Sequence, residues 1–191
     1  MSVPEYLAGF ISIIIGLALA DLAVSVQRLL RAGRRVTWDL LTPAATLLVT
    51  AFIINVWWAS YTSLEAMRSI TVASFIPDLI SLLLLFSLAS SALPDEVGDR
   101  PLDLAEYYRD NRKWFWGLFA LYTLWVTLVA GVRTSLAGAT PVMLAGTVVP
   151  NLVLASLMLI LVAVERKWVH VTIIALLLLT SGLAWLPSEL R

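Results

Sequence analysis

The sequence predicts an all-α integral membrane protein, a bundle of six transmembrane helices in a single domain covering residues 1–191. Three observations support this fold class. Hydrophobic residues make up 60% of the chain and the mean hydropathy is +0.90, whereas about 45–50% of a soluble domain is apolar. These residues gather in long runs and not in amphipathic patterns. Basic residues, finally, are concentrated in alternate connections between the runs.

Each run is long enough to cross a hydrocarbon core of about 30 Å at about 1.5 Å per residue. Because lipid offers no hydrogen-bond partner to the backbone, each span is expected to be α-helical. The continuous apolar runs also lack the alternation of barrel strands. The spans are predicted at 6–30, 38–62, 71–93, 114–135, 139–164 and 168–186.

The lysines and arginines predict an orientation. Ten of the 13 lie in the connections after spans one, three and five. The positive-inside rule places these connections in the cytoplasm and both termini outside. The expected location is the plasma (inner) membrane of a bacterium, with the lipid bilayer as the first partner. Four tryptophans are expected at the inner membrane interface, where amphipathic rings prefer to lie: Trp38, Trp114, Trp116 and Trp168.

Residues 94–113 form the one sizeable connection. Its first part is rich in turn-forming and acidic residues. Residues 103–112 are predicted to form a short interfacial helix before span four, because Leu104, Tyr107 and Tyr108 share one side of it. This segment is either a simple connector or a docking site for a cytoplasmic protein partner.

Asp21 is the first candidate for a functional residue. Asp21, Ser25 and Arg28 follow one another at i, i+4 and i+7 and therefore share one helix face. A carboxylate inside a span costs on the order of 3 kcal/mol, so it is expected to face protein or water. Asp21 is then either a proton or cation site, or a packing group that bonds another helix or a nearby arginine.

Two further polar residues follow prolines. Asp78 comes after Pro77, where a kink would free backbone carbonyls for a cation or water. Alternatively, the helix begins near Pro77 and Asp78 is a first-turn acid stabilised by the helix dipole, an interpretation that we favour slightly. Asn151 comes after Pro150 in the middle of span five. It is either a pore or binding element or, as we favour, a hydrogen-bonding group between helices.

Other residues give weaker indications. His170, the only histidine, is either a cytoplasmic pH sensor or an ordinary interfacial residue. One histidine and no cysteine argue against a haem or a zinc site, so neither a cofactor nor a metal is expected. A formal net charge of zero gives no indication of nucleic-acid binding. Basic residues expected to face lipid or a partner are Arg31, Arg34, Arg35, Arg109, Arg112 and Lys113.

Several stretches together resemble small bacterial multi-pass inner-membrane proteins of uncharacterised function. The stretches are 16–22 (GLALADL), 27–31 (QRLLR), 57–58 (WW), 103–109 (DLAEYYR) and 112–116 (RKWFW). The resemblance spans most of the chain. It implies a membrane location but no activity, and no functional residue is transferred from it.

The sequence therefore favours an ion or proton pathway of the channel or transporter type in a small homo-oligomer. Asp21 and Arg28 would lie at its inner mouth and Asp78 or Asn151 further out. The alternative is a non-catalytic membrane module that binds a protein partner or lipid through its basic cytoplasmic connections. An intramembrane enzyme ranks last, because no nucleophile and base pair is evident and no catalytic residue is predicted.

Overall fold

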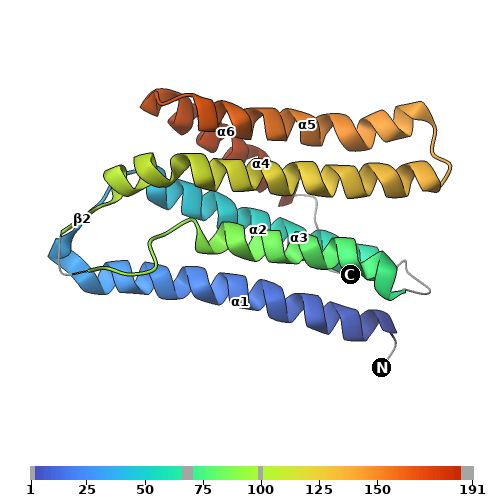
Figure 1. Cartoon of the computed structure of the whole chain (residues 1–191), viewed down its shortest axis with the longest axis horizontal. Coiled ribbons are helices and arrows are strands. Elements are labelled where there is room, and N and C mark those ends of the chain that lie inside the picture. Colours follow the sequence, from blue (N-terminus) through green and yellow to red (C-terminus); the bar gives the residue numbers. More distant parts are fainter. Residues whose placement is uncertain (1–2, 66–70, 99–100, 186–191) are drawn as a thin grey trace.

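The computed structural model describes residues 3–65, 71–98 and 101–185 (Figure 1). Six α-helices account for most of these residues: α1 Val3–Ala32, α2 Leu41–Glu65, α3 Val72–Ser90, α4 Leu104–Leu136, α5 Pro141–Ala163 and α6 Lys167–Trp185. Within the described residues, the prediction of an all-α chain with six helices is confirmed. All except α6 are long and apolar enough to cross a membrane.

Local sequence explains where several helices begin and end. Thr71 caps α3 in a capping box with Ser74, and Thr140 caps α5 by accepting a hydrogen bond from the backbone of Met143. Gly33 after α1 and Gly138 after α4 have φ values of 54° and 75°. Only glycine adopts this left-handed conformation without steric cost, so these positions end their helices.

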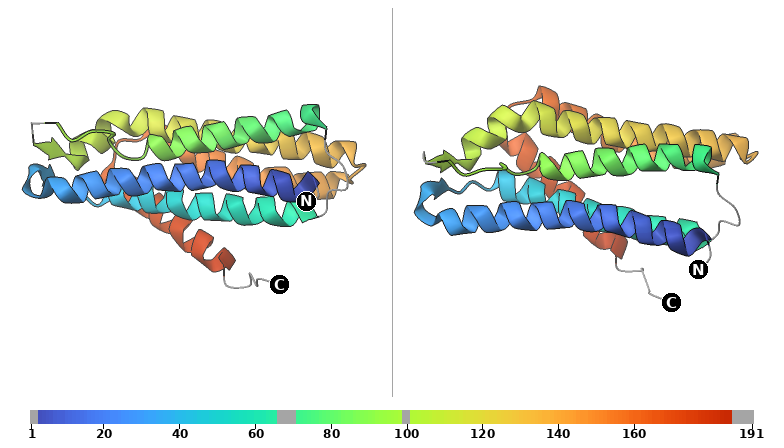
Figure 2. Two further views of the ribbon diagram at one scale, coloured as in Figure 1. Left: turned by 90° about the horizontal axis from the view of Figure 1, so that it is seen from below. Right: turned by 60° about the horizontal axis from the view of Figure 1, so that its bottom comes forward.

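The first five helices run approximately along the long axis of the molecule, while α6 slants away from them (Figure 2). Helix α3 lies between α1 and α4, and α5 lies beside α4 (Figure 1). We call the end formed by residues 28–40, 101–113 and 164–168 the cap end. The opposite end, formed by residues 71–78 and 130–143, is the far end.

Helix α4 differs from its prediction. The expected short interfacial helix at 103–112 and the expected span at 114–135 form one continuous helix of 33 residues. Asp103 starts this helix by accepting a hydrogen bond from the backbone N–H of Ala105. At 1.5 Å per residue α4 is about 50 Å long, well beyond a hydrocarbon core of about 30 Å. Trp116, expected at the interface, is instead fully buried, while Trp38, Trp114 and Trp168 are exposed.

A small separate core joins the connections at the cap end. Strand β1, Val36–Thr37, follows the 3₁₀ turn η1, Gly33–Arg35, and pairs in parallel with β2, Leu102–Asp103. The side chains of Leu29, Val36, Leu93 and Leu104 are buried together beneath this pairing. The hydroxyl of Thr42 also donates to the carbonyl of Leu104 at 2.9 Å. These contacts fix the cap end to the starts of α2 and α4.

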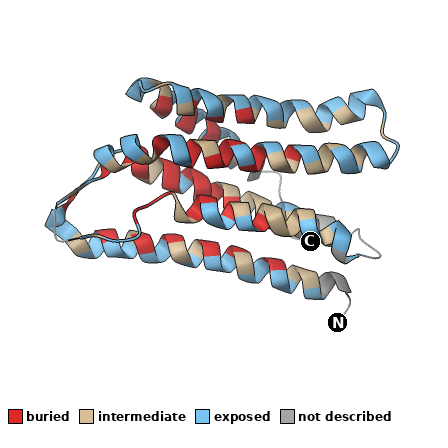
Figure 3. Ribbon diagram, in the orientation of Figure 1, coloured by how far each residue is buried: buried red, intermediate tan, exposed pale blue. Residues whose placement is uncertain are grey.

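The main core is concentrated in the half of the bundle near the cap end (Figure 3). Trp116 and Phe119 stack with centroids 6.0 Å apart, and Phe52 packs on both Phe119 and Tyr122. Toward the far end, fewer residues of the helices are buried (Figure 3). The bundle is therefore tightly packed in one half and more open in the other.

We expect Leu104→Ala to lower the free energy of unfolding by about 2–5 kcal/mol, because it leaves a cavity in the small core. Thermal or denaturant unfolding in detergent measures the effect. Leu121→Ala on the same helix is the matched control, since Leu121 is exposed, and it should cost less than about 1 kcal/mol. Equal effects of the two substitutions would show that the small core contributes no particular stability.

Candidate functional site

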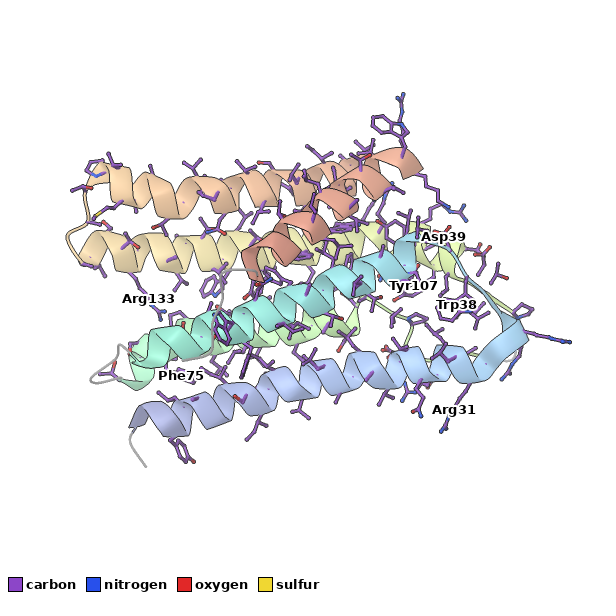
Figure 4. All side chains as sticks on the ribbon, turned by 180° about the vertical axis from the view of Figure 1, so that it is seen from behind. Arg31, Trp38, Asp39, Phe75, Tyr107 and Arg133 are labelled. Carbon is purple, nitrogen blue, oxygen red and sulfur yellow. The ribbon has the colours of Figure 1, made fainter. Side chains whose placement is uncertain are left out.

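A cavity of about 690 Å³ lies toward the far end, between α1, α2, α3, α4 and α5. Phe75 and Arg133 belong to this end, opposite the end that holds Arg31 and Tyr107 (Figure 4). Much of the cavity wall is apolar. Its polar residues are Asn55, Ser60, Ser74, Asp78, Ser81, Tyr122, Arg133 and Asn151.

An ion pair between α3 and α4 borders the cavity. Arg133 donates from Nη1 and Nη2 to the two carboxylate oxygens of Asp78, at 2.8 and 2.9 Å. Its Nη2 also donates to the backbone carbonyl of Ser74 at 3.0 Å. Such a bidentate pair fixes geometry as well as charge. Because 35% of the Asp78 side chain and 44% of the Arg133 side chain are exposed, the pair forms the rim of the cavity.

The structure also settles the alternatives for Pro77. Helix α3 begins at Val72 and Pro77 lies inside it, so a helix start near Pro77 with Asp78 as a first-turn acid is wrong. The carbonyl of Pro77 accepts hydrogen bonds from Ser81 at 2.9 Å and from the indole N–H of Trp125 at 3.2 Å. Helix α4 therefore holds both Pro77 and Asp78 in place.

Tyr122 lies deeper in the cavity. It is 11 residues from Arg133 on α4, about 16 Å along the helix axis. Only 3% of Tyr122 is exposed, and its hydroxyl has no hydrogen-bond partner among the described residues, although it lines the cavity. The hydroxyl is not among the fully buried polar atoms, and it can donate to or accept from a molecule in the cavity. Asn151 also lines the cavity, and its amide nitrogen donates to the carbonyl of Thr147 at 3.0 Å.

The structure thus brings together two of the predicted pathway residues, Asp78 and Asn151, and separates them from the other three. Asp21 accepts a hydrogen bond from the hydroxyl of Ser90 on α3 at 2.7 Å. Arg28 donates to the backbone carbonyl of Asp95 and does not pair with Asp21. Ser25 is buried. The face of α1 that carries these three residues contacts the end of α3 and the segment that follows it, outside the cavity.

A second polar cluster lies at the cap end around His170, which is buried. Its Nε2 lies 2.8 Å from the carbonyl of Val164, which can only accept, so Nε2 carries a proton. Its Nδ1 lies 2.7 Å from the hydroxyl of Tyr108. The indole N–H of Trp116 donates to that hydroxyl at 2.9 Å, which leaves the Tyr108 proton for Nδ1. Both ring nitrogens of His170 therefore have a partner when the histidine is neutral. A pH-sensing role for His170 stays a prediction.

The structure contradicts the expected position of Arg112. It was expected to face lipid or a partner, but only 4% of it is exposed. Its guanidinium donates to the carbonyl of Val164 and to the carboxylate of Glu165, both at 2.9 Å. Arg112 therefore holds the turn between α5 and α6 against α4, because the last carbonyls of a helix need donors. The other basic residues of that prediction are exposed: Arg31, Arg34, Arg35, Arg109 and Lys113.

Sequence reasoning also missed the contact between Asp39 and Lys167, which joins the start of α2 to the start of α6. Burial by itself raises the pKa of Asp39, but hydrogen bonds from Lys167 and from the backbone N–H groups of Leu41 and Leu40 outweigh it. The pKa of Asp39 is therefore held below its usual value. The long sequence separation of the two residues gave no signal of this pair.

No protein-family model, curated protein or solved structure significantly matches this chain. Within the described residues, no group of three or more histidine, cysteine, aspartate or glutamate side chains is placed to hold a metal ion. The groups at the site are one ion pair, amides and hydroxyls beside an apolar wall.

We expect Asp39→Asn to destabilise the protein by about 1 kcal/mol at pH 7, since Lys167 is largely exposed and water screens the pair. A carboxyl group whose pKa is lower in the folded than in the unfolded state stabilises the fold at pH values above its unfolded-state pKa. This stabilisation is lost as the pH falls through its folded-state pKa. The difference from wild type should therefore shrink below about pH 4. Unfolding in detergent as a function of pH tests this. Glu96→Gln, at an exposed position, is the control; a difference that grows on acidification would contradict the assignment.

Proposed function

We propose that the protein is a membrane transport protein for a small organic solute, and that the cavity at the far end is its binding site. One observation carries the proposal. The cavity combines a reachable ion pair and the hydroxyl of Tyr122, which makes no hydrogen bond to another described residue, with apolar walls from four helices, α1 to α4. Pockets for small molecules typically have this composition and volumes of about 300–1,000 Å³.

In this proposal all six helices cross the membrane. The exposed Trp38, Trp114 and Trp168 mark its boundary at the cap end, and many large apolar side chains on the helices face outward. The basic cap end lies in the cytoplasm of a bacterium and the far end, with both termini, outside. The tightly packed half near the cap end then closes the cavity toward the cytoplasm.

An ion or proton pathway remains the second candidate. The observation in its favour is Asp21, a half-buried carboxylate whose hydrogen-bond partner is the neutral hydroxyl of Ser90 and not a cation. The cavity supports this candidate less well, because Arg133 already neutralises Asp78 there. A homo-oligomer, and a protein partner bound through 94–113, stay predictions.

The first test uses the absence of cysteine from the chain. In intact proteoliposomes, Ala130→Cys and Ser81→Cys, which line the cavity, should react with a membrane-impermeant maleimide. Ala120→Cys, buried on the same helix as Ala130, should not react. Ala175→Cys is exposed on α6 but should also stay unmodified, because acyl chains cover it. If Ala175→Cys is labelled and the two cavity thiols are not, both the membrane placement and the access of water to the cavity are contradicted.

The second test is uptake of a panel of labelled small organic solutes into proteoliposomes. Filling the cavity with Ala130→Trp should reduce uptake at least about tenfold, because the solute loses its site. Ala175→Trp, on an outward-facing position, is the matched control and should leave uptake unchanged. If only protons or inorganic cations pass and their flux needs Asp21, as Asp21→Asn would show, the second candidate is correct.

A further inference from the structure

We infer that the solute is a zwitterion with a net charge of zero, whose anionic group binds Arg133 and whose cationic group binds Asp78. The inference rests on the proposed function and names the class of solute that the same cavity takes. Three properties of the cavity lead to it: its size, the balance of its charges, and the position of those charges above an apolar wall.

The size of the cavity favours an organic molecule over a bare ion. A water molecule occupies about 30 Å³ in the liquid, whereas the cavity measures about 690 Å³. An inorganic ion would contact only a small part of such a wall and would keep most of its hydration shell. A molecule the size of an amino acid, in contrast, reaches the wall on several sides.

The charges favour a net-neutral ligand. Among the described residues that line the cavity, Asp78 is the only carboxylate and Arg133 the only cation, and they neutralise each other. An anion that takes Arg133 leaves the Asp78 carboxylate unpaired in a partly buried position, and a cation that takes Asp78 leaves Arg133 unpaired. A zwitterion replaces both partners at once and leaves neither charge unpaired.

The geometry permits this exchange. Two N–H groups of Arg133 already point at a pair of carboxylate oxygens, which is the arrangement that a ligand carboxylate or phosphate needs. The bond from Arg133 to the carbonyl of Ser74 does not involve Asp78, so it can persist and keep the guanidinium in place. Both side chains are reachable at the rim.

The wall below the rim defines the rest of the ligand. Phe52, Phe75 and Val126 line the cavity with apolar surface, so the zwitterionic group is expected to carry an apolar substituent. Two sources have this chemistry: a free amino-acid-like solute, and the head of a zwitterionic lipid such as phosphatidylethanolamine. The experiment below separates them.

The test is calorimetric titration of the purified full-length protein in detergent. The zwitterionic probes are glycine, L-leucine, L-phenylalanine and glycerophosphoethanolamine. N-acetyl-L-leucine lacks the ammonium group, and L-leucine methyl ester lacks the carboxylate. We expect at least one zwitterion to bind about tenfold or more tightly than either singly charged leucine derivative. Preference for the amino acids identifies a free solute, and preference for glycerophosphoethanolamine identifies a lipid head.

Two substitutions should switch the preference. Asp78→Asn removes the anion and should favour N-acetyl-L-leucine over the methyl ester, whereas Arg133→Gln should favour the methyl ester over N-acetyl-L-leucine. Opposite preferences in the two variants cannot result from misfolding, which would only weaken the binding of both probes. Glu96→Gln, which removes an exposed carboxylate that does not line the cavity, is the control and should keep the wild-type order.

The inference fails if no zwitterion binds wild type, or if both variants keep the wild-type order of probes. It can fail while the proposed function stands: solute uptake that needs an unfilled cavity but is indifferent to Asp78 and Arg133 would give that result. If the cavity thiols are inaccessible and Ala130→Trp has no effect on uptake, the proposed function fails as well.

Discussion

Scarcity of polar side chains governs how these apolar helices pack. Apolar surfaces give little resistance to sliding, because one leucine contact resembles the next. Each polar contact between helices, in contrast, is made at one register only. Ser90 and Asp21 align α3 with α1, Arg133 and Asp78 align α4 with α3, and Arg112 aligns the turn after α5 with α4. A polar group left without its partner in an apolar surrounding is costly, so these few bonds specify the bundle.

The same contacts divide the bundle into two halves with different properties. Near the cap end, large side chains such as Trp116 and Phe119 fill the space between helices, and Tyr108, Trp116 and His170 form hydrogen bonds with one another. Toward the far end, the helices separate around a space that retains the hydroxyl of Tyr122 and a reachable ion pair. The half near the cap end holds most of the buried core, and the other half holds the cavity.

The positions of the helices could be predicted because length and hydropathy are local properties of a chain. Partners across helices could not, because they depend on rotation and register. Asp78 and Asn151 stood out as polar residues beside prolines, yet nothing local indicated that they line one cavity with Tyr122. Arg133 resembled an ordinary basic residue at a helix end. Arg112 was misread for the same reason: a basic residue near a predicted interface gives no sign that it turns inward.

The continuity of α4 has a mechanical consequence. Arg112 and Arg133 are 21 residues apart on one helix without a proline, which is about 32 Å along its axis and about 60° around it. An uninterrupted, rigid helix therefore joins the two arginines. A twist that draws Arg133 away from Asp78 therefore strains the bonds from Arg112 to Val164 and Glu165 at the opposite end. The turn between α5 and α6 and the ion pair at the far end are thereby held by one and the same helix.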